Sequence, residues 1–572
     1  MARSGALLRR AESDGNPRRP VDRRRPNSAR RPADDRPGVP RRPAPYAHAD
    51  PHPAQRRRHQ LSGTGLERRS AVGQLLLQPR RQNVRLPSEG PVDARQAVNA
   101  TAVAVTLGWR AFLSGGSETM ASKAVDRRDF LAAAGATAIG AAATCTAGDS
   151  ARAAAAGDRV RLAVVGIHGR GGHLARKLAA RGDSEVAYVC DVDQSLLAAC
   201  AGEVEQIQQR APQLASDFRR ALDDKDVDAI VVATPDHWHA LATVWGCQAG
   251  KDVYVEKPAS HTPWEGRKMV EAARRYGRIV QVGTQNRSAP YNIAAKAYLD
   301  AGKLGSVHFV RVFNQKSWPN FPAVDDGAVP AGLDWDMWTG PAPQCPYNEN
   351  FHRRWNHFWR FSGGDIINDG VHQIDLARWL VGKAYPQSVY STGGRYAEPG
   401  ACESPDTQLA VFQFEDLVMA FDLTLYTPYM IKSDQALRDS DMFPYWPQNA
   451  ERIEIYGSAG LMVVGRHGCG WQVFDRPKDR QPVIAAQGNG PFPDDAHLAD
   501  FLHCVRTRET PSADIEQGHR STLLCQLANI SYRLGGRKLV VDAATETLVG
   551  DQEANQLLRR EYRAPWVVPE VV

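Results

Sequence analysis

Residues 159–285 alternate between strand-like and helix-like segments, and this alternation constrains the fold more than any other feature. Apolar runs typical of buried strands occur in VRLAVVG (160–166), SEVAYVCDVD (184–193), DVDAIVVATP (226–235), DVYVEKP (252–258) and RIVQVGTQ (278–285). Amphipathic stretches such as GGHLARKLAARG (171–182) lie between them. Strands that alternate with helices form a parallel sheet covered on both faces. We therefore predict an α/β fold that begins with a doubly wound parallel sheet over residues 157–285.

The pattern changes after residue 285. Several later runs alternate with period two, as half-buried antiparallel strands do. These runs are VHFVRVFN (307–314), QLAVFQFED (408–416), VMAFDLTLY (418–426), RIEIYG (452–457), GLMVVG (460–465) and KLVVD (538–542). Helical patterns occupy residues 370–381, 496–507 and 514–534. We predict that residues 286–572 form a C-terminal α+β domain with a large open, mostly antiparallel sheet.

The basic charge of the chain is concentrated at its N-terminus. Residues 1–119 hold 23 Arg, no Lys and 10 acidic residues, a net charge of +13, whereas residues 120–572 carry −6. Residues 1–119 are rich in Pro and Arg and lack apolar periodicity, so we expect them to be disordered. They are either a basic tail or residues upstream of the true start at Met120. A nucleic-acid partner is not expected, because the remaining chain is acidic.

Residues 120–156 have the organisation of an export signal. Arg127 and Arg128 precede an apolar run from Phe130 to Ala143, and small residues follow. The RRDFL core resembles the twin-arginine signal, which directs folded proteins across a membrane. The apolar run is shorter than the ~20 residues that a membrane-spanning helix needs. We expect an exported, periplasmic protein without stable membrane association.

The nine cysteines form no CxxC pair. Zinc-binding and thioredoxin-like sites therefore have no support, and we predict no metal site.

The loop VVGIHGRGGHL (164–174) joins the first strand to the first helix, where open α/β sheets bind dinucleotide pyrophosphates. Gly166 and Gly171 hold the first and third positions of a G-x-G-x-x-G pattern, but His168 holds the second. Close approach of the cofactor then requires a turn reshaped around Gly169. Asp191 ends the second strand, 25 residues after Gly166, at the place of the acid that binds a ribose 2′-hydroxyl. Because a carboxylate there repels a 2′-phosphate, NAD is favoured over NADP.

Four further segments resemble the Gfo/Idh/MocA oxidoreductases, which include glucose–fructose oxidoreductase and inositol dehydrogenase. They are TPDHWHA (234–240), EKP (256–258), VGTQNRS (282–288) and GGDIINDGVHQIDLARWL (363–380). Residues 514–539 resemble the C-terminal region of exported bacterial members. The resemblance implies a Rossmann domain, an α/β substrate domain and a nicotinamide cofactor. The cofactor-binding set that we predict is Gly166, His168, Gly169, Arg170, Gly171, Asp191, Thr234, Pro235, His239, Glu256 and Lys257.

The resemblance also implies a catalytic group. Lys257 matches the family's active-site lysine and could stabilise a developing alkoxide, with Pro258 holding the turn through a cis bond. His372 matches the catalytic histidine, which can accept a hydroxyl proton. In the family an acid stands four positions before this histidine, where this chain has Asn368. Asp369 stands three positions before it, and both spacings place a residue on the same helical face. We favour Asn368 as a polar substrate ligand, and the alternative is that Asp369 has taken over the acid's role.

We expect Asp375 to orient His372. The other residues that we expect to line the substrate pocket are Gln285, Arg287, Trp355 and His357.

These features predict an NAD-dependent oxidoreductase that acts on a sugar, polyol or related cyclic alcohol. The resemblance also implies a homo-oligomer, a dimer or tetramer. One alternative is an NAD-dependent glycoside hydrolase that recycles its cofactor, although Lys257 favours the dehydrogenase. The other is a non-catalytic sugar- or nucleotide-binding protein, because a fold does not fix a function.

Overall fold

The computed structural model describes residues 159–572 except 318–320, 398–399, 434, 439 and 441. The predicted disordered segment and the predicted export signal lie outside the described residues. All described residues belong to one compact unit. No helix in this part of the chain is long and apolar enough to cross a membrane.

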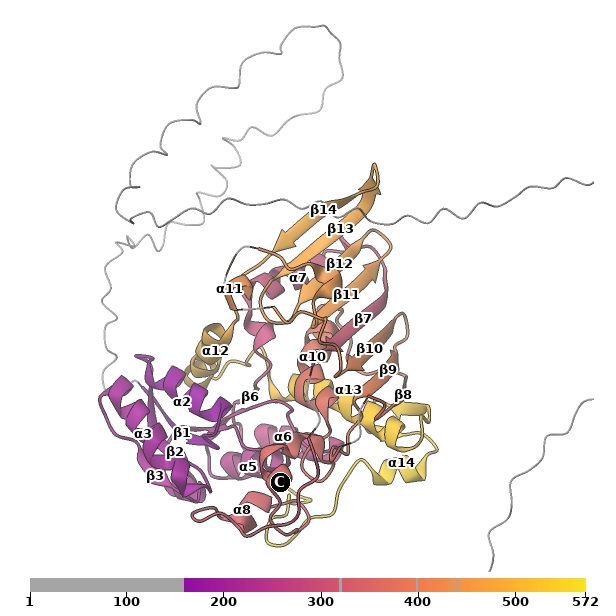
Figure 1. The fold of residues 1–572 in the computed structure, drawn as a ribbon. Coiled ribbons are helices and arrows are strands. Elements are labelled where there is room, and N and C mark those ends of the chain that lie inside the picture. The colour runs from indigo at the N-terminus through magenta and orange to yellow at the C-terminus, as the bar shows by residue number, and fades with distance from the viewer. Residues whose placement is uncertain (1–158, 318–320, 398–399, 434, 439, 441) are drawn as a thin grey trace, which may run out of the picture. The chain divides into compact units, whose positions relative to one another are not determined.

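The first sheet is parallel and has six strands in the order β3-β2-β1-β4-β5-β6. Its first three strands are purple in Figure 1. This is the order expected of a Rossmann fold, and it confirms the predicted fold class. The strands are β1 (Val160–Val165), β2 (Ser184–Cys190), β3 (Gln213–Ala215), β4 (Ala229–Val232), β5 (Asp252–Val255) and β6 (Val280–Val282). The sequence analysis did not identify β3, because this strand is short and exposes Gln213 and Leu214.

Helices connect these strands and place their amino ends near the carboxyl edge of the sheet. They are α2 (Arg170–Ala179), α3 (Gln194–Gln208), α4 (Arg219–Asp223), α5 (Asp236–Gln248) and α6 (Pro263–Arg275). Helix α6 begins with a capping box, in which Thr262 and Glu265 each bond the other's backbone N–H.

The second sheet has ten strands in the order β14-β13-β12-β11-β7-β10-β9-β8-β15-β16. Only the β7–β10 pair is parallel, which confirms a large, mostly antiparallel sheet. The strands are β7 (Val307–Gln315), β8 (Ser388–Gly394), β9 (Thr407–Gln413), β10 (Val418–Thr424), β11 (Arg452–Gly457), β12 (Leu461–Gly465), β13 (Trp471–Lys478), β14 (Gln481–Gly488), β15 (Leu539–Asp542) and β16 (Thr547–Leu548).

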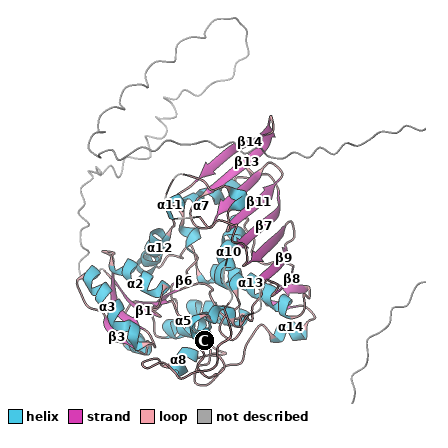
Figure 2. Ribbon diagram, in the orientation of Figure 1, coloured by secondary structure: helices cyan, strands magenta, loops and turns pink. Residues whose placement is uncertain are grey.

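One face of this sheet packs against α10 and α13, and Figure 2 shows these helices on the same side of the strands. The remaining α-helices are α7 (Pro290–Asp300), α8 (Trp335–Thr339), α9 (Glu349–Arg353), α10 (Val371–Leu380), α11 (Gln435–Arg438), α12 (Asp494–Thr507), α13 (Ile515–Arg533) and α14 (Gln552–Gln556). A π-helical turn at Ile366–Gly370 leads directly into α10. The predicted helices near 370–381, 496–507 and 514–534 correspond to α10, α12 and α13.

Segments from the end of the chain complete the core of the first sheet. Leu498 and Phe501 on α12 pack in one hydrophobic cluster with Leu162 of β1. Trp566 and Val568 near the C-terminus join the cluster on the other face. The structural unit around the first sheet therefore extends beyond residues 157–285.

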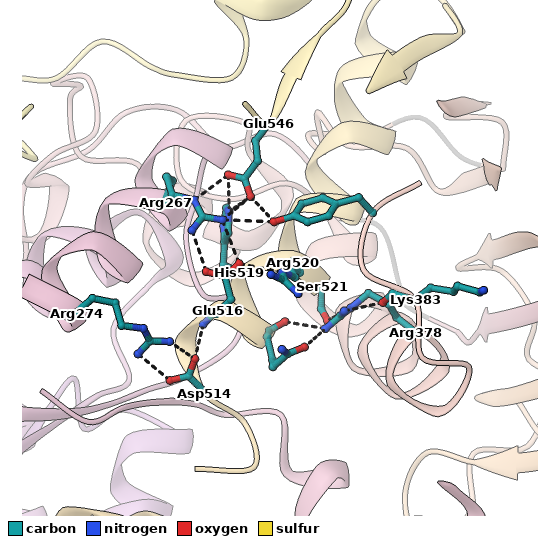
Figure 3. Close-up of polar contacts among 12 residues, drawn as sticks. Arg267, Arg274, Arg378, Lys383, Asp514, Glu516, His519, Arg520, Ser521 and Glu546 are labelled. Atoms are coloured by element: carbon teal, nitrogen blue, oxygen red, sulfur yellow. Dashed lines mark hydrogen bonds and ion pairs between the residues drawn. The ribbon is translucent and has the colours of Figure 1, made fainter. Parts of the chain in front are cut away.

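A network of ion pairs joins α6 to α13, and Figure 3 shows its side chains converging. Arg267 on α6 donates to Glu516 at 2.8 Å and to Glu546 at 2.5 Å. The buried His519 on α13 lies 2.9 Å from Glu546 through its Nε2. Arg274 pairs with Asp514 in the same interface. These contacts hold the two sheets in one unit, because α6 covers the first sheet and α13 the second.

Candidate active site

A cavity of about 400 Å³ lies at the carboxyl ends of the first sheet, where open α/β sheets bind ligands. The ends of β1, β2, β4 and β5 all contribute to it. The predicted residues that line it are Gly166, His168, Gly169, Arg170, Asp191, Thr234, Pro235, Glu256, Lys257, Trp355 and Asn368. The aromatic segment after β7 covers it with Met337, Trp338, His352 and Arg353.

The glycine loop has the reshaped turn that the sequence required. Gly166 has φ +78°, and a Cβ there would meet the Ala233 carbonyl oxygen at 2.8 Å. Gly169 has φ +63° and caps α2, with no atom within 4 Å of a Cβ built on it. A Cβ on Gly171 would overlap the Gly166 carbonyl oxygen, so Gly171 packs the loop and lies outside the cavity lining. A cofactor can therefore approach the backbone closely at Gly169, whereas the side chain of His168 hinders such an approach.

Asp191 is held rigidly at the cavity edge. Its carboxylate accepts hydrogen bonds from the backbone N–H of Ile167 at 2.8 Å and of Asp193 at 3.0 Å. Thr234, across the cavity at the end of β4, has a buried Oγ1 without a hydrogen-bond partner. The open loop, the carboxylate at the end of β2 and this unsatisfied hydroxyl fit a dinucleotide.

Arg170 and Glu256 bind each other across the cavity floor. Arg170 Nε donates to Glu256 Oε1 at 2.9 Å, and its two terminal nitrogens donate to Asp494 of α12 at 2.8 Å. Gln285, predicted as a substrate ligand, points its amide at Glu256 and the Tyr254 hydroxyl, at 3.4 and 3.3 Å. The guanidinium of Arg170 therefore fixes the loop to α12. Gln285 is buried, supports Glu256 and Tyr254 through its amide, and does not line the cavity.

Lys257 and Asn368 meet at the end of β5. The Lys257 ammonium donates to the backbone carbonyl of Asn368, and its Nζ lies 3.4 Å from Asn368 Oδ1. Burial lowers the pKa of Lys257, and the charges of Asp369, Glu256 and Asp236 oppose this effect. The Lys257–Pro258 peptide bond is cis. Both polar side chains line the same cavity.

Asp369 is ion-paired with two cations of the second domain. Its carboxylate accepts from Lys316 at 2.5 Å and from Arg466 at 2.7 Å. Burial would raise the pKa of Asp369, but Arg466 and Lys316 more than offset burial and hold that pKa well below its usual range. Of the two neighbours, Asn368 lines the cavity and Asp369 does not, which favours Asn368 as the substrate ligand.

His372 is buried, and its Nδ1 has no hydrogen-bond partner. Burial lowers the pKa of His372 well below its ordinary value; Arg466 and Lys257 reinforce this effect and Asp369 opposes it. These effects favour the uncharged form of the imidazole, and His372 does not line the cavity. His372 is close enough to Lys257 and Asp369 for their charges to act on it.

Asp375 does not orient His372, contrary to the prediction. Its two oxygens accept from Arg287 at 2.8–3.0 Å, and Ser521 donates to it at 2.6 Å. Arg287 and Asp375 are both fully buried. They form a buried ion pair, and neither residue lines the cavity.

Two predicted histidines also have packing roles. The ring nitrogens of His239 lie 2.7 Å from the Pro258 carbonyl oxygen and 2.9 Å from that of Thr234, so the ring links the ends of β4 and β5. His357 packs edge-on against Phe321 and does not line the cavity. Trp355 does line it.

The sequence analysis missed Asp236, which begins α5 inside the quoted TPDHWHA segment. It lines the cavity, is almost fully buried, and accepts a hydrogen bond from the Ser362 hydroxyl. Burial raises the pKa of Asp236 to about 6. The position of Asp236 directly after Pro235, at the end of a strand, could have identified it as a site residue from the sequence. Lys316 and Arg466, the partners of Asp369, carried no motif and could be found only from the tertiary structure.

Family profiles match most of the described chain. The profile described as an oxidoreductase family with an NAD-binding Rossmann fold matches residues 160–284. The profile of the same family's C-terminal alpha/beta domain matches residues 296–535.

Individual relatives agree with these matches. The inositol 2-dehydrogenase 2 of Saccharopolyspora erythraea is 30% identical over 251 residues, which are 43% of this chain and 60% of that protein. The NAD(+)-dependent scyllo-inositol 2-dehydrogenase of Bacillus subtilis is 27% identical over 326 residues, 54% of this chain and 77% of that protein. The chain thus spans about six-tenths of the first of these relatives.

Solved structures share the fold. The crystal structure of aldose-aldose oxidoreductase from Caulobacter crescentus covers 67% of this chain and 100% of its own, with 18% identity and a TM-score of 0.51. The two profiles together match more than half of the sequence, and the chain belongs to the Gfo/Idh/MocA oxidoreductase family, whose N-terminal domain binds NAD.

Proposed function

We propose that the protein transfers hydride between NAD and a carbon-bound hydroxyl of a sugar, polyol or related cyclic alcohol. The single observation that carries this proposal is the meeting of Lys257 and Asn368 at the edge of the dinucleotide cavity. His372 is near enough to Lys257 for their charges to interact. The relatives named as inositol dehydrogenases support the substrate class.

The residues of this chain divide the binding work. The backbone around Gly166 and Gly169, with the amino end of α2, would hold the pyrophosphate, and Asp191 would hold the adenosine ribose. Because Asp191 is a carboxylate, it repels the 2′-phosphate of NADP. NAD, when bound, supplies the nicotinamide that exchanges hydride.

The proton chemistry belongs to Lys257, Asn368 and His372. The Lys257 ammonium donates a hydrogen bond to the substrate oxygen and stabilises its developing negative charge. Asn368 orients the hydroxyl, because an amide can donate and accept but cannot take the proton. His372 accepts the hydroxyl proton during oxidation and returns it during reduction.

A test begins with the protein purified without added nucleotide. After denaturation, mass spectrometry identifies any released dinucleotide, and the protein is then screened against inositols, aldoses and their derivatives by absorbance of NADH. Release of NAD or NADH, or saturable binding of added NAD, followed by turnover of a polyol, supports the proposal. A protein that binds neither NAD nor NADP would contradict it.

We further propose that the protein is exported to the periplasm through its twin-arginine signal, already folded and loaded with cofactor. The support is the sequence RRDFL followed by an apolar run. Replacement of Arg127 and Arg128 by Lys should leave the protein in the cytoplasmic fraction, whereas an unchanged distribution would contradict export by this route.

We also propose self-association through the second sheet. Five large apolar side chains are exposed on its strands: Tyr390, Leu409, Val418, Ile484 and Val540. Light scattering coupled to size-exclusion chromatography should give a dimer or tetramer, and a strictly monomeric mass would contradict this.

A further inference from the structure

A second cavity, of about 350 Å³, shares none of the residues that line the first. It is bounded by the start of α6, the segment after α8, the last turns of α13 and the chain beyond α14. Four arginines line it, together with a single acidic residue, Glu561: Arg360, Arg533, Arg559 and Arg560.

Two of these guanidinium groups have no carboxylate partner among the described residues. Arg533 lies over the Trp359 ring at 5.4 Å and Arg360 over the Phe351 ring at 4.9 Å. Burial lowers the pKa of Arg533, with Glu403 opposing the effect. Arg360 also contacts the Cys345 side chain. Guanidinium groups without a carboxylate at ion-pair distance leave positive charge available to an anion.

Arg560 adds an unused donor. It donates to Glu265 and to the His237 carbonyl, both at 2.7 Å, yet its remaining terminal nitrogen is buried without a partner. A buried guanidinium nitrogen without an acceptor costs free energy, and a ligand oxygen in the cavity would remove that cost.

Two residues that line this cavity also carry buried acceptor atoms without partners. Gln526 is 4% exposed, and its Oε1 has no partner while its amide nitrogen donates to the Ser260 carbonyl at 2.9 Å. His261 Nε2 lies 3.0 Å from the Trp359 carbonyl and must donate to it, which leaves the buried, unpartnered Nδ1 as an acceptor.

The cavity therefore presents cationic donors for an anion, acceptors for hydroxyl groups, and the Trp359 indole as an apolar wall. We propose that it is a second ligand site, separate from the dinucleotide cavity, for a small polyhydroxylated anion such as a sugar phosphate or a sugar acid. The chemistry does not depend on the redox function, so this proposal stands or fails on its own.

Isothermal titration calorimetry of the full chain tests the site with glucose 6-phosphate, gluconate, glucose and inorganic phosphate. At least one of the two hydroxylated anions should bind with a stoichiometry of one, and about tenfold tighter than glucose or phosphate. The comparison of glucose 6-phosphate with gluconate decides between a phosphate and a carboxylate. If neither hydroxylated anion binds, the proposal is overturned.

Variants locate the binding. Arg533→Gln and Arg360→Gln should each weaken it by about tenfold, since each removes a charged donor. Arg476→Gln, on the exposed β13–β14 hairpin, and Lys257→Met, in the first cavity, should leave it unchanged. If Arg533→Gln does not fold, Arg533→Lys keeps the charge and should bind within about threefold of the unaltered protein. Binding that depends on Lys257 and ignores the arginines would place the ligand in the first cavity and overturn the proposal.

Discussion

Asn368 and Asp369 are neighbours in sequence, yet their side chains lie in different surroundings. The π-helical turn at Ile366–Gly370 widens the backbone just before α10, and such turns are frequent at functional sites. Asn368 lines the cavity beside Lys257, whereas Asp369 is paired with Lys316 and Arg466. Ordinary helical spacing could not separate the two residues, because it assumes an α-helix through both.

Replacement of the proton acceptor should remove turnover without removing the fold. His372→Ala is expected to lower kcat by about 10²–10⁴, the usual contribution of a positioned acid–base group. NAD binding, measured by calorimetry, should persist, because His372 does not line the dinucleotide cavity. The exposed His308 offers a matched control, and His308→Ala should keep full activity. Unchanged turnover in His372→Ala would assign the proton to another group.

The Asp191 carboxylate should set the preference for NAD. Asp191→Asn removes the negative charge at similar size, so discrimination between NAD and NADP, measured as the ratio of the two kcat/KM values, should fall by about tenfold. The amide can still accept a hydrogen bond from Ile167, which limits damage to the loop. If the ratio does not change, Asp191 supports the loop and does not select the cofactor.

At the scale of elements, buried ion pairs fix how helices meet. Arg287, at the end of the first domain, pairs with Asp375 on α10, and Ser521 on α13 donates to the same carboxylate. Three segments distant in sequence therefore depend on one carboxylate. Arg287 and Asp375 were predicted to bind substrate because they are polar, but they bind each other and do not line the cavity.

Loss of that carboxylate should be costly. Asp375→Asn leaves the buried Arg287 charge without compensation, which is expected to lower the free energy of unfolding by about 3–5 kcal/mol. Asp300→Asn is the matched control, because it breaks the exposed Lys296–Asp300 pair on α7 and should cost less than about 1 kcal/mol. Urea denaturation of the three proteins measures the difference. If both variants lose the same free energy of unfolding, the buried pair contributes no more to stability than the exposed pair.

At the scale of the whole molecule, acid should weaken the ion-pair network between α6 and α13, and with it the stability of the fold. Burial would raise the pKa of Glu546, but its bonds with His519 and Arg267 more than offset burial and hold that pKa well below the ordinary value. A carboxyl whose pKa is lower in the folded state stabilises the fold above its unfolded pKa, near 4.5, and this contribution disappears as the pH falls through the folded value.

The melting temperature should therefore drop as the pH is lowered below about 5, and Glu546→Gln should be less stable at neutral pH but lose less on acidification. Glu415→Gln, on an exposed turn, should keep the pH dependence of the unaltered protein. Melting curves between pH 7 and pH 3 measure this. A Glu546→Gln variant with an unchanged slope would show that other groups control acid sensitivity.

Local patterns in the sequence were sufficient for the architecture and for the dinucleotide end of the site. Apolar runs that alternate with helices specify a parallel sheet, and Gly166, Gly169 and Asp191 stand at strand ends, where the topology itself brings them together. β3 was not identified, because a strand of three residues, two of them exposed, is too short to show a periodic pattern.

Only the tertiary structure decided which polar residues face the cavity. Gln285, Arg287 and Asp375 are chemically suitable ligands, but each is bonded to a partner from a distant segment and lies outside the cavity lining. A residue type states what a side chain can bind, whereas the packing of residues far apart in the chain determines what it does bind.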